Sequence, residues 1–174
     1  VTLLRPGKGI ETLIDALPAV LATHPTASVA IAGDGPDRGA LEERARAAGV
    51  DQAVRFLGET AGPMALLHGA DLFVSASWAE SFPYNVLEAM AAGLPVVATD
   101  VGGTAEAVEH ERTGLVVPAR DPDALSGAIA ALIADPAQGT RFGKAGRQRV
   151  EERFGLERMI EGTLAVYRRA GGLP

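Results

Sequence analysis

The stretch SASWAESFPYNVLEAMAAGLPVVAT, residues Ser75–Thr99, decides the fold of this chain. The run Asp71–Val74, mostly apolar, comes directly before it, and a second apolar run, Val96–Thr99, ends it. Between them, Pro83 is typical of the first residue of a helix, and Gly93–Pro95 is typical of the turn that follows one. The pattern predicts a strand, a loop, a helix, a turn and a strand, which together form one βαβ unit.

Two carboxylates flank the start of the predicted helix: Glu80 lies in the loop, and Glu88 lies in the second helical turn. The amides that follow Pro83, from Tyr84 and Asn85 onward, are expected to point unpaired into the crevice at the end of the first strand. Such a helix end attracts phosphate, and the two carboxylates can accept hydrogen bonds from hydroxyl groups. A nucleotide sugar carries both kinds of group. The alternative is that Glu80 is a solvated loop residue and Glu88 an ordinary polar helix position.

The rest of the chain alternates short apolar runs with helical patterns. The predicted strands are Val1–Leu4, Ser28–Ala32, Val54–Leu57, Leu72–Ser75, Val96–Thr99 and Gly114–Val117. The predicted helices cover Ile10–Ala22, Pro36–Ala48, Pro63–Gly69 and Ala124–Ala134, with two more between residues 137 and 170. Apolar strands that alternate with helices indicate parallel crossovers and helices on both faces. We therefore expect an α/β fold, a doubly wound, Rossmann-like parallel sheet of about six strands, in one domain over residues 1–174.

Composition limits the classes of function. An apolar fraction of 47% is sufficient for a buried core, and aromatic residues make up only 5%. The net charge of −6 and the lack of a basic cluster argue against nucleic acid as a partner. With no cysteine, disulfides and thiolate chemistry are excluded. No run approaches the ~20 apolar residues of a transmembrane helix.

Two basic residues follow the first predicted strand and should lie at the same edge of the sheet as Glu80. Lys8 follows a Gly-Pro turn and could neutralise a pyrophosphate leaving group, and Arg5 could assist with its planar guanidinium. The alternative is that Lys8 is solvated, as most lysines near turns are.

Other motifs favour structural roles. The turn Gly33–Pro36 is not a dinucleotide fingerprint, because that fingerprint would require glycine where the chain has Arg38. Asp121-Pro122-Asp123 matches a D-x-D metal pattern, but a helix follows it, and we predict a helix cap. The three histidines, His24, His68 and His110, lack metal-ligand spacing, so no metal site is predicted.

The run Glu80–Met90, continued by Gly93–Thr99, resembles the E-x7-E signature of glycosyltransferase family 4, whose members are retaining enzymes of the GT-B fold. This block is specific. The likeness extends over nearly the whole chain, although its glycine turns are individually weak: Lys8-Gly9, Ala32–Pro36, Phe56–Gly58, Gly102-Gly103 and Gly114-Leu115.

The resemblance implies the C-terminal, donor-binding half of such an enzyme. Lys8 would contact the donor phosphates and Glu80 would lie beside the transferred sugar, so these two are the expected catalytic residues. Glu88 would bind the ribose hydroxyls. The amides near Tyr84 and Asn85 would bind the pyrophosphate, and Leu57 and Gly58 would lie beside the base. The expected donor-binding residues are Arg5, Leu57, Gly58, Phe82, Tyr84, Asn85 and Glu88. The family often has arginine at the position of Leu3, and Arg5 is expected to replace it. Family members need no metal, and no cofactor is expected.

The chain begins in a predicted strand without a methionine, so we expect a piece of a longer protein. Its partners would be a nucleoside-diphosphate sugar and an absent N-terminal acceptor-binding domain, and self-association through the exposed face is a further expectation. The piece alone should transfer no sugar. A cytoplasmic location is expected, peripheral at the inner membrane if the absent domain binds there. Two alternatives remain: a non-catalytic nucleotide-sugar binding or assembly module that works with a separate partner chain, and a GT-B epimerase or phosphorylase.

Overall fold

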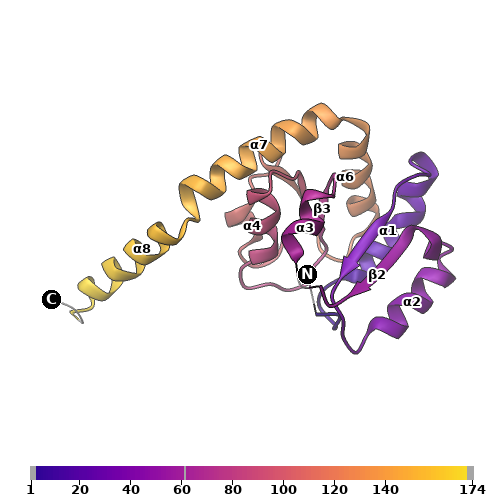
Figure 1. Ribbon diagram of the computed structural model, residues 1–174, viewed down its shortest axis with the longest axis horizontal. Coiled ribbons are helices and arrows are strands. Elements are labelled where there is room, and N and C mark those ends of the chain that lie inside the picture. The colour runs from indigo at the N-terminus through magenta and orange to yellow at the C-terminus, as the bar shows by residue number, and fades with distance from the viewer. Residues whose placement is uncertain (1–2, 61, 172–174) are drawn as a thin grey trace.

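The strands of this chain form two parallel sheets with helices around them, in the computed structural model shown in Figure 1. The structure describes residues 3–60 and 62–171. In chain order the elements are α1 (Ile10–Thr23), β1 (Val29–Ala32), α2 (Arg38–Ala47), a 3-10 turn (Asp51–Ala53), β2 (Val54–Gly58), α3 (Pro63–His68), β3 (Phe73–Ser75), α4 (Tyr84–Ala91), β4 (Val96–Thr99), α5 (Thr104–Ala107), β5 (Gly114–Val117), α6 (Pro122–Ala134), α7 (Pro136–Arg153) and α8 (Leu156–Arg169).

All strand pairs are parallel, as predicted. β1 pairs with β2, starting at Val29 opposite Val54. In the second sheet β4 lies between β3 and β5, with Val96 opposite Phe73 on one side and Gly114 on the other. The fold class is therefore confirmed: an α/β domain with parallel strands.

Where about six strands were predicted, the residues that the structure describes contain five, in one sheet of two strands and one of three. Only part of the first predicted strand, Val1–Leu4, falls within the described residues. Leu3 and Leu4 lie outside any strand, and Val1 and Thr2 lie outside the described residues. Within the described residues, β1 and β3 are not hydrogen-bonded to each other, so the strands form two sheets where one was expected.

The central βαβ unit forms as predicted from its sequence. All four residues of β4 are buried, which explains why this strand is a continuous apolar run rather than an alternating one. The helix between the strands ends before Gly93, whose φ of 81° is readily adopted only by glycine. It begins one residue later than predicted, because Pro83 is the N-cap and Tyr84 the first helical residue.

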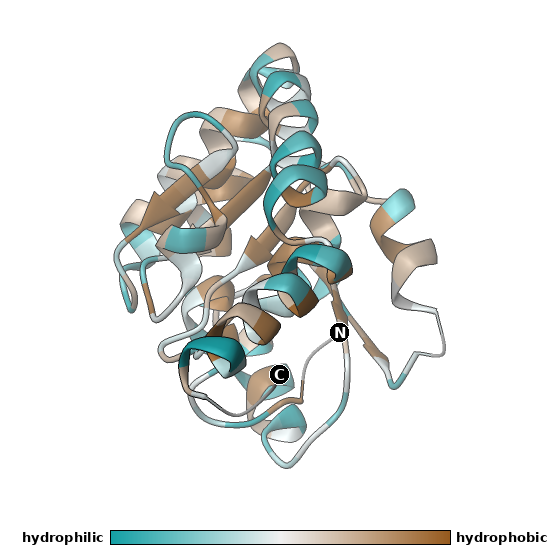
Figure 2. Ribbon diagram, turned by 90° about the vertical axis from the view of Figure 1, so that its left-hand side faces the viewer, coloured by the Kyte–Doolittle hydropathy of each residue, from teal (hydrophilic) through white to brown (hydrophobic). Residues whose placement is uncertain are grey.

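The core is built from aliphatic side chains of strands and helices. α1 packs against α6, and α4 packs against α7. Figure 2 shows the strands as the most hydrophobic segments, with hydrophilic residues on the outer sides of the helices. Among the largest fully buried side chains are Leu4, Ile14, Met90 and Leu125.

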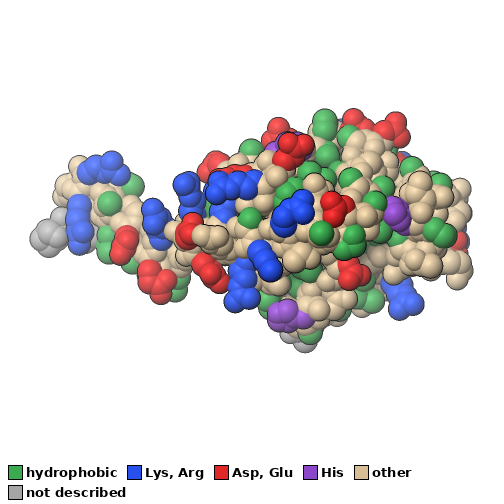
Figure 3. All heavy atoms as spheres, turned by 90° about the horizontal axis from the view of Figure 1, so that it is seen from above, with side chains coloured by type: hydrophobic (Ala, Val, Ile, Leu, Met, Phe, Trp, Pro, Cys, Tyr) green, Lys and Arg blue, Asp and Glu red, His purple; other side chains and the backbone are tan. Residues whose placement is uncertain are grey.

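Helix α8 differs from the other long helices because none of its residues is buried. It extends away from the body of the domain in Figures 1 and 3. Five large apolar side chains on it are exposed: Leu156, Met159, Ile160, Val166 and Tyr167. Within the described ranges, no helix has the length and apolar composition required to cross a membrane.

Candidate active site

An ion pair between Lys8 and Glu80 lies at the carboxyl edge of the sheets. The Lys8 Nζ atom is 2.8 Å from Oε2 of Glu80, although the two residues are 72 positions apart in the chain. Their side chains are 21% and 20% exposed, so the pair is partly desolvated but open to a ligand. The prediction that Lys8 lies at the same edge of the sheet as Glu80 is therefore confirmed, and the direct ion pair between them is a finding of the structure.

The turn that carries Lys8 is held against the segment that follows β3. The amide of Trp78 donates to the carbonyl oxygen of Gly7 at 2.8 Å. Gly9 has φ 65°, and a Cβ atom at this position would overlap the carbonyl oxygen of Ala76. Only glycine permits this close approach, and the approach brings Lys8 to Glu80.

The side chain of Trp78 also contacts the helix that follows the Lys8 turn. Its indole N–H donates to the hydroxyl of Thr12 on α1 at 2.9 Å, and the guanidinium of Arg120 lies 4.3 Å from the indole ring centroid. The sequence analysis placed Trp78 in the loop but assigned it no role. One signal was available, since this is the only tryptophan of the chain and it lies two residues before Glu80.

We expect Trp78→Phe to destabilise the chain by about 1–2 kcal/mol, because the buried Thr12 hydroxyl loses its hydrogen-bond donor. Urea unfolding measures this change. In a double-mutant cycle with Thr12→Val, a coupling energy of about 1 kcal/mol is expected. Two effects that simply add would show that the bond between Trp78 and Thr12 does not hold the turn.

Gly102 and Gly103 contact the backbone of the loop that carries Glu80. Gly102 has φ 50°, and a Cβ atom there would overlap the carbonyl oxygen of Glu80. The amide of Gly103 donates to the carbonyl oxygen of Ser81 at 3.0 Å. The double glycine after β4 therefore lets a second loop approach the backbone of Glu80 and fix its position.

The start of α4 is less open than predicted. The amide of Tyr84 donates to the Phe82 carbonyl oxygen at 3.1 Å, so the expectation of an unpaired Tyr84 amide is wrong. The amide of Val86 donates to the Asn85 side chain at 2.9 Å and to the Pro83 carbonyl at 3.0 Å. Among the described residues, only the amide of Asn85 at this helix end has no hydrogen-bond acceptor. The amides of Tyr84 and Val86 donate to local acceptors instead of pointing into the crevice, because Pro83 occupies the cap position and not the first helical position.

Phe82 and Tyr84 form an aromatic edge beside this helix end. Their ring centroids are 5.9 Å apart in a T-shaped arrangement, and the Tyr84 side chain is exposed. Phe82 also contacts Phe154, with centroids 5.8 Å apart. Phe82 is thereby fixed by packing, whereas Tyr84 is free to meet a ligand.

Glu88 and Asn85 line the same cavity as Lys8, on the side of α4. Glu88 is exposed, and its carboxylate has no hydrogen-bond or ion-pair partner among the described residues. Arg5 is exposed, and its carbonyl accepts from the Lys8 amide at 3.3 Å. The structure thus pairs Lys8 with Glu80 and places Lys8, Asn85 and Glu88 along the lining of one large cavity, and the Arg5 side chain makes no hydrogen bond or ion pair with them.

Leu57 and Gly58 end strand β2 beside the turn after β1. The Gly58 carbonyl accepts from the Gly33 amide at 2.8 Å, and Leu57 is exposed. Arg38 links the turn after β1 to β2, because it donates to Asp34 at 2.9 Å and to the Phe56 carbonyl oxygen at 3.4 Å. The Gly35 amide, and after it Arg38, lower the pKa of Asp34 below its usual value.

The glycine turn after β1 has the structural role that was predicted for it. The Asp34 side chain accepts from the Gly35 amide at 2.8 Å. The backbone of Leu4 lies so close to Gly35 that a Cβ atom there would overlap it. Helix α2 begins at Arg38, two residues after Pro36, where we had predicted its start.

The cap predicted at Asp121 is confirmed, because its side chain accepts from the Ala124 amide at 2.8 Å at the start of α6. This bond explains the D-x-D pattern without a metal. Over residues 3–60 and 62–171, no group of three or more His, Asp or Glu side chains is arranged to hold a metal ion.

The fold and the position of the ion pair define the chain as a Rossmann-like α/β domain with its candidate site at the carboxyl edge, where such sheets bind ligands. The family described as "Glycosyl transferases group 1" matches residues 1–149. The chain belongs to this family and is a C-terminal domain of the GT-B, family-4-like type.

Relatives and solved structures agree with this assignment. A glycogen synthase of Mycobacterium tuberculosis is 38% identical over 162 residues, which are 92% of this chain and 39% of that protein. A GDP-mannose-dependent phosphatidylinositol monomannoside mannosyltransferase of the same species is 36% identical over 154 residues, 83% of this chain and 40% of that protein. The structure of Anabaena Alr3699/HepE in complex with UDP matches with a TM-score of 0.87 and 29% identity, over 95% of this chain and 47% of the other. The chain therefore spans less than half the length of these proteins.

Proposed function

We propose that the chain is the donor-binding half of a retaining glycosyltransferase that moves a sugar from a nucleoside-diphosphate sugar to an acceptor. The observation that carries this proposal is the partly buried ion pair between Lys8 and Glu80 at the carboxyl edge, with Glu88 unpaired in the cavity that Lys8 also lines. A structural neighbour that binds UDP supports the nucleotide part of the donor.

Lys8 is suited to stabilise the departing diphosphate. Its ammonium group has three N–H donors, of which one is directed at Glu80 at 2.8 Å. The other two have no acceptor among the described residues and can donate to phosphate oxygens. When the bond between the sugar and the diphosphate breaks, its electron pair passes to the phosphate oxygen, and Lys8 stabilises that negative charge. Glu80 orients Lys8 and lies where the transferred sugar would be.

The remaining residues bind the donor in this proposal. Glu88 accepts hydrogen bonds from the ribose hydroxyls, and the unpaired amide of Asn85 donates to the pyrophosphate. Tyr84 covers this end of the donor with its exposed ring. Leu57 and Gly58 lie at the end of a neighbouring strand and border the base.

The proposal includes a second domain that binds the acceptor and precedes these residues, because the chain spans 39% and 40% of the two curated relatives described above. It also includes metal independence, retention of configuration, and no transfer by the chain alone. The exposed apolar face of α8 would lie against the acceptor-binding half, or it would support self-association in its absence. A cytoplasmic location, peripheral at the inner membrane, completes the proposal.

The test is calorimetric titration of the chain with UDP-glucose, GDP-mannose and ADP-glucose. One donor should bind, and Glu88→Gln should weaken its binding by about 10-fold, since a charged hydrogen bond to ribose is lost. Glu161→Gln, an exposed position on α8, is the matched control and should leave binding unchanged. No binding of any donor, or an equal effect of both variants, would contradict the assignment of Glu88.

A non-catalytic nucleotide-sugar binding or assembly module is the other candidate. It predicts the same titration but no transfer when the longer protein is supplied with donor and acceptor. Transfer that is lost on mutation of Lys8 distinguishes the enzyme from the module.

A further inference from the structure

The second half of α7 carries a mostly buried arginine that has no part in the proposed reaction. The side chain of Arg149 is 12% exposed, and it forms an ion pair with Glu109. Its guanidinium also donates to two backbone carbonyl oxygens, that of Ala107 at 2.9 Å and that of Glu106 at 2.8 Å. Because the guanidinium is planar and rigid, three bonds to one distant segment fix that segment against α7.

The segment that Arg149 holds includes the end of α5, a helix of only four residues. A helix this short is not stable by itself, and the carbonyl oxygens of its last turn have no donor within the helix. Arg149 supplies the donors for Glu106 and Ala107 at this end. The position of α5 therefore depends on the groups that contact its two ends.

The other end of α5 contacts the loop that carries Glu80. Gly102 and Gly103 directly precede α5 and lie against the backbone of this loop, as described above. Residues 76–83 of the loop belong to no helix or strand, so the contacts of the loop fix its position. Helix α5 thus connects Arg149 at one end with the Glu80 loop at the other.

A second contact joins the end of α7 to the same loop. Phe154 is the C-cap of α7, and its ring centroid is 5.8 Å from that of Phe82, which lies two residues after Glu80. The ring of Phe82 also lies against Gly103, where a Cβ atom would be 2.6 Å from a ring carbon. The Arg149 guanidinium is 5.8 Å from the Phe154 ring centroid, within the range of a cation–π attraction. The end of α7 therefore supports the loop both through α5 and through Phe82.

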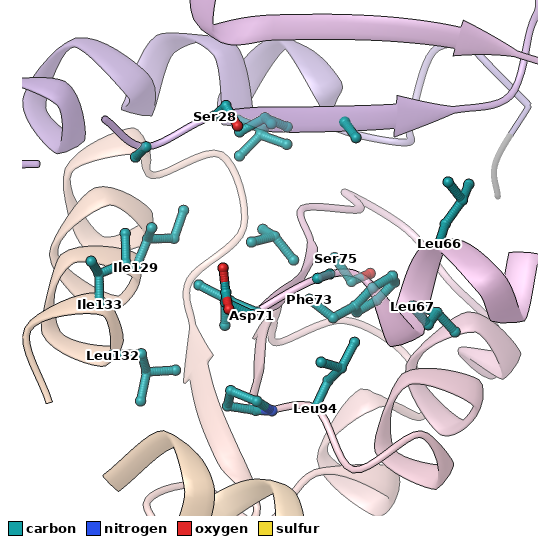
Figure 4. A pocket seen from close by; sticks show the side chains of 18 of the residues that line it. Ser28, Leu66, Leu67, Asp71, Phe73, Ser75, Leu94, Ile129, Leu132 and Ile133 are labelled. Carbon is teal, nitrogen blue, oxygen red and sulfur yellow. The ribbon is translucent and has the colours of Figure 1, made fainter. Parts of the chain in front are cut away.

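Arg149 does not line the large cavity that Lys8 lines. This cavity has a volume of about 1110 Å³, and aliphatic side chains such as Leu67, Leu94 and Ile129 surround it in Figure 4. Helix α7 contributes to the lining only from its first half, and Lys144 is its last residue there. We therefore assign Arg149 no contact with a ligand in this cavity.

We propose that Arg149 is a positioning residue for the donor site, and that it acts together with Phe154 on the loop that carries Glu80. Through α5 and Phe82, it keeps this loop where Glu80 reaches Lys8 at 2.8 Å. The support of the loop is a property of the fold, whereas its effect on donor binding rests on the proposed function. A loop that is already held in place binds a ligand more tightly, because binding then costs less ordering.

The first measurement is hydrogen exchange of the Gly103 amide. This amide donates to the Ser81 carbonyl oxygen at 3.0 Å, so its protection reports whether the start of α5 and the loop stay together. Arg149→Ala and Phe154→Ala should each speed its exchange by about 10-fold or more relative to the amides of Val96–Thr99, because the loop opens locally while the sheet stays closed. If Arg149→Ala does not fold, Arg149→Lys takes its place.

Two variants on the same helix are matched controls. Arg147→Ala removes an arginine whose side chain is 62% exposed and paired with Glu151, and it should change neither exchange nor binding. Phe142→Leu shortens a buried core side chain, so it should lower Tm without opening Gly103 relative to the sheet. The second control separates the support of the loop from a general loss of stability.

The second measurement is calorimetric titration with UDP-glucose, GDP-mannose and ADP-glucose. For a donor that the unaltered chain binds, Arg149→Ala should weaken binding by about 10-fold, although Arg149 does not touch the donor. Arg149→Lys keeps the charge beside Glu109 but not the planar group that reaches both carbonyl oxygens, so its affinity should lie between the two. Phe142→Leu should bind the donor as the unaltered chain does, at a temperature where both are folded.

Two results would overturn the proposal. Gly103 exchange that stays unchanged in both alanine variants, or that rises no more than the exchange of the sheet, would show that the end of α7 does not support the loop. Unchanged donor affinity in a variant whose Gly103 amide has opened would show that the support has no effect on the site. Faster Gly103 exchange in a chain that binds none of the three donors would support the positioning of the loop and contradict the proposed function instead.

Discussion

Replacing Lys8 with alanine is expected to lower sugar transfer by the longer enzyme by about 10²–10³-fold, the effect of removing one preorganised donor to a developing anion. In the isolated chain the same change should weaken the binding of a nucleoside diphosphate by about 10-fold or more, because one charge-assisted hydrogen bond is lost. Turnover assays measure the first effect and calorimetry the second. The effect on turnover should exceed the effect on binding, since the phosphate charge grows as the sugar departs.

Two further variants distinguish a specific role of Lys8 at the phosphate from a general effect of charge on binding and turnover. Arg141→Ala removes a positive charge from an exposed position on α7 and should change neither quantity. Glu80→Gln keeps an oxygen acceptor for Lys8 but removes the charge, so Lys8 should stay in place while transfer falls. Normal turnover of the Lys8→Ala enzyme would remove Lys8 from the reaction.

Gly102→Ala is expected to destabilise the chain by about 4 kcal/mol or to prevent folding, because the new Cβ atom would overlap the Glu80 carbonyl oxygen. The overlap involves backbone, which cannot rotate away as a flexible side chain could. The φ of 50° at this position adds a smaller cost for any residue with a Cβ atom. Thermal or urea unfolding measures the loss, and a folded variant should also bind donor less tightly because the Glu80 loop has moved.

Gly127→Ala is the matched control. Gly127 lies inside α6, and a Cβ atom there would meet nothing within 4 Å. Alanine lowers the entropy of the unfolded chain and favours the helix, so a gain of about 0.5–1 kcal/mol is expected. If the two variants had equal stability, the close approach of Gly102 to Glu80 would not be a constraint of the fold.

Local patterns predicted the parts of this protein that depend on near neighbours in sequence. The apolar run of β4, the turn at Gly93 and the cap at Asp121 were all correct, since strand burial, a left-handed turn and an N-cap each involve a few adjacent residues. The start of α4 was off by one residue. Pro83 is compatible with both the cap and the first helical position, and the choice between them decided which amides stayed free.

Contacts between distant segments needed the structure. The role of Trp78 depends on Thr12 and Arg120, which are far from it in the chain, and no local pattern indicates that they meet. The same holds for Gly102, whose need for glycine comes from the backbone of Glu80 and not from its own neighbours.

The sequence by itself determined the α/β class, the parallel strands and the family, because hydrophobic periodicity and a specific motif are local properties. Only the tertiary structure decided that Lys8 and Glu80 pair at 2.8 Å and that the Trp78 indole donates to Thr12 of α1. These features depend on which backbones approach each other across the fold. Such approaches join residues that are far apart in the chain, so they leave no periodic pattern in the sequence.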